Sequence, residues 1–323
     1  MAVSRSTHTK GSVVALCRRA PRLLVASALA LALTSAAACG DDDDPEASDD
    51  TASEQAETTE ASAEPTALEA TLTDAAIEGA PDEIPSGLVE VTVTDETEGA
   101  GGEINLTHVE EGTDTTEFVS GLTPVFGGGA FPEYFLNNAG VSGSGTVVLE
   151  PGEYIVWFDK ASELDRESTA EDIVTAPLTV TEGDDAAELP TADGTITSRD
   201  YEFTVDVAAG ASTVNFVNES QEQFHNVSIV DFGTNDPQVV EDNLPAILEA
   251  EDPNSLPPGV DGSQINFDFG GSGVFGPGSA GTFDVTFEEG NTYVGLCFIQ
   301  DRDGGAPHAE EHDQYEIFQV DAG

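Results

Sequence analysis

Short runs of β-branched and aromatic residues, separated by turn-forming residues, are the feature of this sequence that most restricts its fold. Each run lies between Gly, Pro, Asn or Asp residues, a pattern that is typical of strands joined by turns. Many short strands of this kind predict an all-β fold, built as a sandwich or a barrel. Two helices are expected between them, and Pro245 is expected to end or kink the second. The expected strands are 89–93, 146–149, 154–158, 202–205, 213–217, 283–287 and 293–298, and the expected helices are 113–119 and 236–248.

The two halves of this strand-rich region resemble each other. Residues 147–154 match residues 285–293 with one residue inserted, and a closing strand follows in each half, at 176–180 and at 315–320. The repeated unit has the size of a single sandwich domain. The sequence therefore predicts two tandem copies of one Greek-key β-sandwich domain.

The first of these predicted domains covers residues 71–185 and the second covers residues 191–323. The acidic stretch 182–194 marks the boundary between them.

The N-terminal residues predict export. Residues 1–38 contain basic residues but no acid, and include an apolar stretch at 23–33, which is the order of a secretory signal peptide. That stretch is too short for a transmembrane helix, which needs about 20 residues. The small residues Ala36–Ala38, followed by Cys39, resemble the bacterial lipobox, whose cysteine becomes diacylated and starts the mature chain. The resemblance implies a protein anchored by lipid on Cys39 to the extracytoplasmic face of the cell membrane. The alternative is an ordinary signal peptide that releases a soluble protein.

Residues 39–70 are predicted to be a disordered acidic tether between the lipid and the first domain. Within them, residues 40–65 contain eleven acids, no basic residue and no apolar side chain larger than alanine. Such a segment cannot bury enough apolar surface to offset the entropy lost on ordering.

Negative charge dominates the chain after Cys39, where four basic residues stand against 63 acids. Such a surface repels nucleic acid and anionic lipid, so nucleic acid is not expected as a partner. The charge either serves solubility in a salty medium, where it is screened, or attracts cations, including metal ions or a basic partner protein.

Cys297 is left without a partner cysteine, because Cys17 leaves with the signal peptide and Cys39 is the expected lipid site. Extracytoplasmic proteins usually pair their cysteines or avoid them. Cys297 is therefore either a small buried hydrophobic residue or a metal ligand. Three histidines accompany it in the second half: His225 in an early strand, and His308 and His312 between Cys297 and the last strand.

This order of residues resembles the cupredoxins, the blue-copper β-sandwich family. The resemblance is closest to cupredoxin-like repeats of bacterial lipoproteins, and it is carried by Cys297–Ile299, Asp303–Gly304 and Pro307–His308. It implies one copper ion held by His225, Cys297 and His308. A thiolate with two imidazoles suits copper in both oxidation states.

A weak axial ligand completes such sites and tunes their potential. The only methionine is Met1, so the mature chain cannot supply the usual thioether. The resemblance implies Gln314 in this role, through its amide oxygen, and His312 is the alternative fourth ligand.

The first half lacks this set of residues. In the repeat alignment Ile104 matches His225 and Phe158 matches Cys297, and no cysteine lies in residues 66–185. His108 is the only histidine there and is expected to be structural or exposed. The first domain is therefore expected to be a metal-free copy.

Two functions from different classes remain. The first is a membrane-tethered protein that binds one copper ion, either to exchange single electrons with a redox partner protein or to hold copper. The second is a metal-free envelope β-sandwich that serves as an interaction module, with Cys297 simply buried. An enzyme is not expected, because the mature chain has four histidines, too few for the multicopper clusters of two-domain copper enzymes.

Overall fold

The structure is a computed structural model that describes residues 64–99, 101–162, 168–183, 187–248 and 256–320. The predicted signal peptide, the predicted lipid site at Cys39 and nearly all of the predicted tether lie outside these residues. No helix in the described part of the chain is long and apolar enough to cross a membrane. The described residues form strands with few helices, which confirms the predicted all-β fold class.

The first half contributes two sheets that face each other. One layer holds four strands in the order β2-β1-β4-β7, and the other holds five in the order β3-β9-β8-β5-β6. The bounds are β1 Thr66–Leu72, β2 Ile77–Glu78, β3 Glu83–Pro85, β4 Gly87–Asp95, β5 Glu103–Val109, β6 Phe135–Ser142, β7 Ser144–Leu149, β8 Gly152–Asp159 and β9 Ile173–Thr181.

The second half also has two layers, with four strands in each. Its two layers have the orders β11-β10-β12-β15 and β17-β16-β13-β14. In each half the first strand pairs in parallel with a later strand, β1 with β4 and β10 with β12, while its other neighbour is antiparallel. The bounds are β10 Gly194–Arg199, β11 Glu202–Asp206, β12 Thr213–Asn218, β13 Ser228–Asp231, β14 Asn266–Gly271, β15 Ala280–Asp284, β16 Thr292–Leu296 and β17 Tyr315–Gln319.

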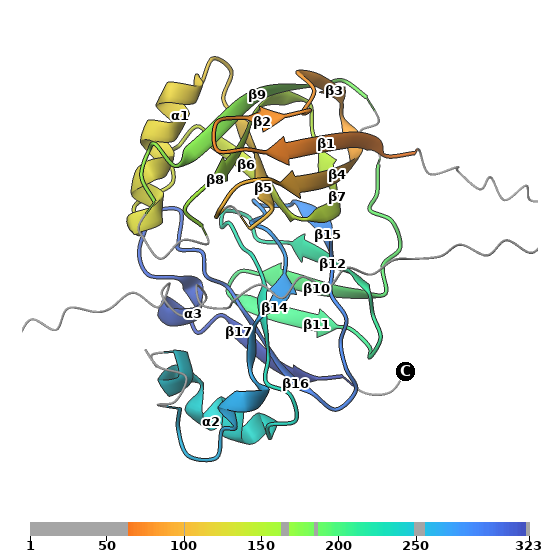
Figure 1. The fold of residues 1–323 in the computed structure, drawn as a ribbon, viewed down its shortest axis with the longest axis vertical. Helices are drawn as coiled ribbons and strands as arrows, with labels where there is room; N and C mark the ends of the chain where they lie inside the picture. Colours follow the sequence, from red (N-terminus) through yellow and green to blue (C-terminus); the bar gives the residue numbers. More distant parts are fainter. Residues whose placement is uncertain (1–63, 100, 163–167, 184–186, 249–255, 321–323) are drawn as a thin grey trace, which may run out of the picture. The chain divides into compact units, whose positions relative to one another are not determined.

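The two halves meet in one sheet. Strands β7 and β15 meet at Val147 and Gly281, and the Thr146 amide donates to the Thr282 hydroxyl at 2.7 Å. The result is an eight-stranded sheet in the order β11-β10-β12-β15-β7-β4-β1-β2 (Figure 1). Counted from either edge toward the middle, the four strands of each half follow the same order: β11-β10-β12-β15 from one edge and β2-β1-β4-β7 from the other.

The predicted end of the tether is wrong by several residues. Strand β1 begins at Thr66, inside the range 39–70, and pairs in parallel with β4. Leu68, Ala70 and Leu72 alternate toward the core and are buried, so this short segment buries apolar surface against it.

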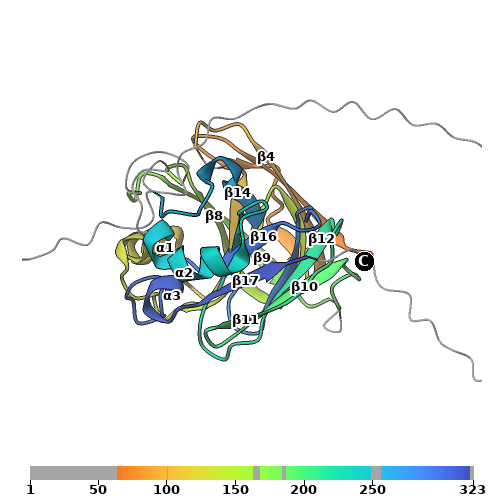
Figure 2. The same ribbon diagram turned by 90° about the horizontal axis from the view of Figure 1, so that it is seen from below.

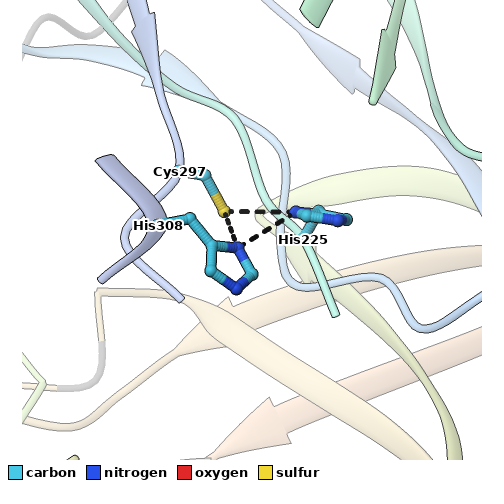
Figure 3. A group of neighbouring side chains, drawn as sticks. All are labelled: His225, Cys297 and His308. Atoms are coloured by element: carbon cyan, nitrogen blue, oxygen red, sulfur yellow. Dashed lines mark hydrogen bonds between the residues drawn. The ribbon is translucent and has the colours of Figure 1, made fainter. Parts of the chain in front are cut away.

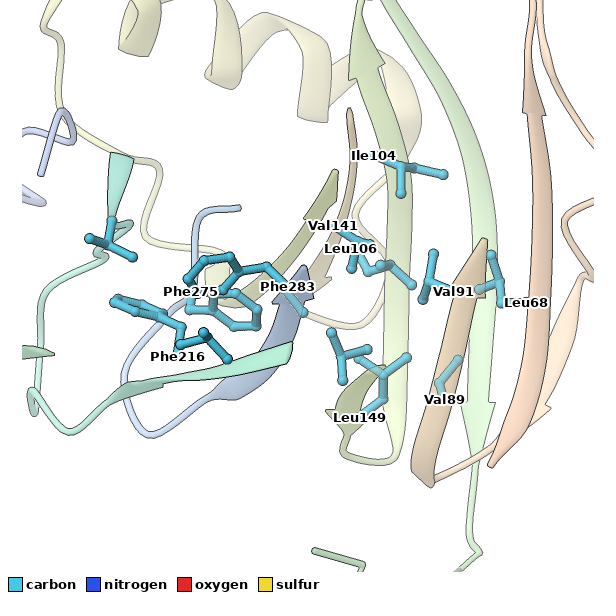
Figure 4. Close-up of a cluster of buried hydrophobic side chains, with 14 of the residues drawn as sticks. Leu68, Val89, Val91, Ile104, Leu106, Val141, Leu149, Phe216, Phe275 and Phe283 are labelled. Atoms are coloured by element: carbon cyan, nitrogen blue, oxygen red, sulfur yellow. The ribbon is translucent and has the colours of Figure 1, made fainter. Parts of the chain in front are cut away.

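A single cluster of buried apolar side chains also spans both halves (Figure 4). Because the strands alternate, one face of each sheet supplies this cluster. Its members include Leu68, Val89, Val91, Ile104, Leu106, Val141 and Leu149 from the first half and Phe216, Phe275 and Phe283 from the second.

Helices occupy the connections at matching places in the two halves. Helix α1, Thr115–Leu122, lies between β5 and β6 and is capped by the Asp114 carboxylate; α2, Pro237–Leu248, lies between β13 and β14. Val240, Leu244 and Ile247 of α2 pack with buried residues of β13 and β16, and Figure 2 shows the helix near β16 and β17. Pro245 lies inside α2 and does not end it; of the two expected effects, the kink stays a prediction. Shorter helical turns are η2 Thr123–Gly127, η4 Gly262–Gln264 and α3 His308–Glu311.

Candidate metal centre

Three side chains from separate parts of the second half converge: those of His225, Cys297 and His308 (Figure 3). His225 lies just before β13 and exchanges two backbone hydrogen bonds with Phe275. Cys297 directly follows β16, and His308 is the first residue of α3. The His308 amide donates to the Ile299 carbonyl at 2.8 Å, which folds the loop back so that the histidine faces the cysteine.

The three atoms that face one another are donors suited to a metal ion. The Cys297 Sγ lies 3.6 Å from the His225 Nδ1 and 3.4 Å from the His308 Nδ1, and the two Nδ1 atoms are 3.2 Å apart. A point at equal distance from all three lies about 2 Å from each, close to the metal–nitrogen and metal–sulfur distances of protein sites. The residues present therefore fit a three-ligand metal site.

Burial keeps the Cys297 sulfur protonated while no ion is bound. The residue is completely buried, and desolvation raises the pKa of its thiol to about 12. The backbone N–H groups of Asn226 and Ile299 point at the sulfur and act in the opposite direction, lowering the pKa. These two dipoles are placed where a thiolate would need them, and a bound metal ion removes the proton outright.

The two histidines are held neutral. Burial lowers the pKa of His225 to about 3, helped by its proximity to His308, and burial also lowers the pKa of His308. Neutral imidazoles are the form that binds metals. The Nε2 atoms of both rings are buried without an aligned hydrogen-bond partner, although the His308 Nε2 lies 3.2 Å from the Asp301 Oδ1.

Gln314 lies directly against this group. It is fully buried beside Cys297, whose backbone amide contacts the Gln314 carbonyl at 3.3 Å. Its side-chain nitrogen donates to the Ser198 hydroxyl at 2.8 Å, which leaves the Oε1 without a partner. Contact with this amide raises the pKa of both histidines, in opposition to burial. Because the Oε1 has no partner, it is the atom of Gln314 that is available as a weak fourth metal ligand.

His312 does not join the three side chains. Its Nε2 lies 3.0 Å from the Asp301 Oδ2, and its ring stacks on Tyr201 with 3.7 Å between centroids. Tyr201 also approaches the His308 ring edge-on and donates its hydroxyl to the Asp301 Oδ1 at 2.7 Å. His312 therefore belongs to an outer layer, separated from Cys297 by His308.

The first half supports the loop that carries His308, which the sequence does not indicate. The Gln300 side-chain amide donates to the Val125 carbonyl at 2.7 Å, and the Phe131 amide donates to the Arg302 carbonyl at 2.8 Å. The Arg302 guanidinium in turn donates to the Phe135 carbonyl at 2.7 Å. Gln300 and Arg302 are recognised as supporting residues only through their contacts with residues some 170 positions away in the chain.

The strand registers correct one part of the repeat alignment. With Tyr154 matched to Tyr293, Phe158 takes the position of Cys297, as predicted. Continued beyond these paired residues of β5 and β13, the same registers bring Ile104 to the position of Val227 and Gly102 to that of His225. Sequence matching missed this because the segments before β5 and β13 share no side-chain pattern. His108 stacks on Tyr154 with 4.7 Å between ring centroids, the structural position expected of it.

No protein-family model matches the sequence, and no curated protein matches it. Among solved structures, dithionite-reduced auracyanin from the photosynthetic bacterium Roseiflexus castenholzii is 27% identical, with 39% of this chain and 94% of that chain covered and a TM-score of 0.22. Auracyanin A, described as a "blue" copper protein, from the green thermophilic photosynthetic bacterium Chloroflexus aurantiacus is 22% identical, with 40% and 100% covered and a TM-score of 0.23. TM-scores this low do not establish a shared fold.

Proposed function

We propose that the second half binds one copper ion through His225 Nδ1, Cys297 Sγ and His308 Nδ1, as a cupredoxin-like site. The observation that carries this proposal is the convergence of one sulfur and two imidazole nitrogens within 3.6 Å of one another in a fully buried place. A soft thiolate and two imidazoles favour copper over the hard cations, which prefer oxygen ligands.

Gln314 is the proposed fourth, axial ligand, through its Oε1. Its support is the buried, unpartnered oxygen and the hydrogen bond that holds the amide to Ser198. His312 is not proposed in this role, because its ring contacts Asp301 and Tyr201 instead.

The bound copper would supply a one-electron couple, and the chain would supply a fixed frame. The hydrogen bonds that hold His225 to Phe275 and His308 to Ile299 keep the ligand atoms in place when the charge of the ion changes. The N–H groups of Asn226 and Ile299 stabilise negative charge on the sulfur. The protein is proposed to be an electron carrier or a copper-holding protein and not an enzyme.

Its proposed location is the extracytoplasmic face of the cell membrane, anchored by lipid on Cys39. The surplus of 63 acids over four basic residues after this cysteine favours a redox partner with a basic surface. Replacing Cys39 by alanine should move the protein from the membrane fraction to the medium, as judged by fractionation, because the acidic tether offers no membrane affinity of its own.

One experiment tests the copper proposal. Mature protein is given one equivalent of copper(II), and the copper content per chain and the visible absorption are measured. We expect one copper per chain and a thiolate charge-transfer band. The Cys297→Ser variant should lose the band, because a hydroxyl is a hard, weakly acidic replacement. A protein that takes up no copper, or a band that survives Cys297→Ser, would instead favour the metal-free interaction module.

A further inference from the structure

A second group of ligand-type side chains lies outside the buried site. It consists of Asp301, Glu311 and His312, and one ligand atom from each lies within 4.8 Å of the other two. Glu311 is exposed, and the side chains of Asp301 and His312 are about one-quarter exposed, at 22% and 26%. The group therefore faces solvent, in contrast to the completely buried His308 beside it.

We propose that Asp301, Glu311 and His312 form an outer cation site that captures copper(II) before the ion reaches the buried ligands. One imidazole nitrogen and two carboxylates are the mixed N,O donors that copper(II) accepts, whereas the buried thiolate also suits copper(I). The capture role rests on the proposed copper function. Binding of a divalent cation by these three residues does not depend on it.

The group is held ready for a cation by its neighbours. The His312 Nε2 and the Asp301 Oδ2 are 3.0 Å apart, close enough for one ion to contact both. Tyr201 fixes them from one side, because it stacks on the His312 ring and donates to the Asp301 Oδ1. The Glu311 Oε2 accepts from the Ala306 amide at 3.1 Å, which orients that carboxylate from the other side.

A separate observation links the outer group to the buried one. The His308 side chain is completely buried, and its Nε2 has no aligned hydrogen-bond partner although it is aimed at the Asp301 Oδ1 from 3.2 Å. The Nδ1 of the same ring faces Cys297. One imidazole thus separates the two sites. A copper(II) ion that passes from outer to inner ligands frees the carboxylates and displaces the thiol proton to solvent, with no change in oxidation state.

The binding test removes the inner site and asks whether a copper(II) site remains. The full mature chain with His225→Ala and Cys297→Ala is titrated with copper(II) at about 0.15 M salt, where charges more than about 8 Å away are largely screened. We expect one bound copper(II), with coupling to a single imidazole nitrogen in the electron paramagnetic resonance spectrum. Adding His312→Gln should remove that coupling and weaken binding by at least about tenfold, the smallest loss usual for changes around metal ligands.

Glu311→Gln and Glu241→Gln separate this site from the general acidity of the surface. Both remove one negative charge from an exposed glutamate at a helix, but Glu241 lies on α2, outside the outer group. With the inner site intact, Glu311→Gln should slow the appearance of the thiolate band after mixing with copper(II), to the same final intensity. Glu241→Gln should leave the rate unchanged.

The outcomes separate the two proposals. Equal slowing by both glutamine variants, or no copper(II) bound when the inner ligands are absent, would overturn the outer site while the thiolate band still supports the inner one. Copper(II) bound to the outer group in a protein that never develops the band would overturn the inner site and leave the outer cation site standing.

Discussion

The two halves of this molecule are similar in strand pairing but differ at the positions where the second half gathers its ligand-type side chains. In the strand registers Gly102 stands at the position of His225, Phe158 at that of Cys297 and Val174 at that of Gln314. The frame is therefore common to both halves, and the proposed copper chemistry depends on a few side chains placed on it. In the first half the same positions hold glycine, phenylalanine and valine, which offer no ligand atoms.

The first half has a different task in the structure. Its segment from η2 to β6 supports the loop of the second half that carries His308, through hydrogen bonds to Gln300 and Arg302. Phe131 adds to this contact by packing on Phe224, directly before His225, with 4.8 Å between ring centroids. The first half thus helps to position the proposed ligands of the second.

The largest expected effect contrasts the histidines of the two halves. His225→Ala or His308→Ala should weaken copper binding by at least about a hundredfold, because each removes an equatorial donor rather than a neighbour of one. His108→Ala should leave the copper affinity unchanged, since its ring stacks on Tyr154 in the first half. Competition with a chelator of known affinity measures all three variants. An equal loss of copper affinity in all three variants would contradict the assignment of copper binding to the second half.

Removing the first half should have the next largest effect. Residues 191–323 expressed alone would expose the edge of β15 and the apolar surface around Phe224, which the first half covers. We expect the free energy of unfolding to fall by at least about 3 kcal/mol, the value of one or two large side chains lost from the core. Denaturant unfolding of the mature chain and the fragment measures this. A fragment as stable as its counterpart in the whole chain would show that the halves are independent.

A single contact between the halves tests the support of the ligand loop. Gln300→Ala removes one of the two donors to the buried Val125 carbonyl, which keeps its hydrogen bond from the Gly128 amide, and should cost about 0.5–1.5 kcal/mol, the net value of one hydrogen bond. Gln221→Ala, at an exposed position of the same half, is the matched control and should cost little. If the loop is held in this way, Gln300→Ala should also broaden or shift the thiolate band of the copper-loaded protein. If neither the band nor the stability changes, the first half does not support the ligand loop through Gln300.

The smallest expected effect concerns the axial position. Gln314→Val installs the residue of the first half and removes the amide oxygen, so the copper should stay bound with a higher reduction potential, because an oxygen donor favours copper(II). Gln314→Met should raise the potential as well. Voltammetry measures both. A potential that stays the same in both variants would show that the Oε1 is not a ligand.

Several features of this protein follow from the sequence alone. Residue order predicts the all-β class, because β-branched runs between turn residues have few other ways to pair. The likeness of the two halves is visible where buried strands constrain both, as in the match of Tyr154 to Tyr293. Cys297 and the two histidines could be singled out because a lone thiol and two imidazoles in this order are rare among so many acids.

Only the tertiary structure decided how these parts meet. Whether Gln314 or His312 faces the cysteine depends on how a short helix turns after His308, which places His312 against Asp301 and Tyr201. Gly102 rather than Ile104 stands at the position of His225 because strand register, not local composition, sets that correspondence. The support from Gln300 and Arg302, and the single sheet through both halves, arise from contacts between residues more than 100 positions apart. Local sequence does not predict such contacts, because they stabilise the protein only when both surfaces have formed.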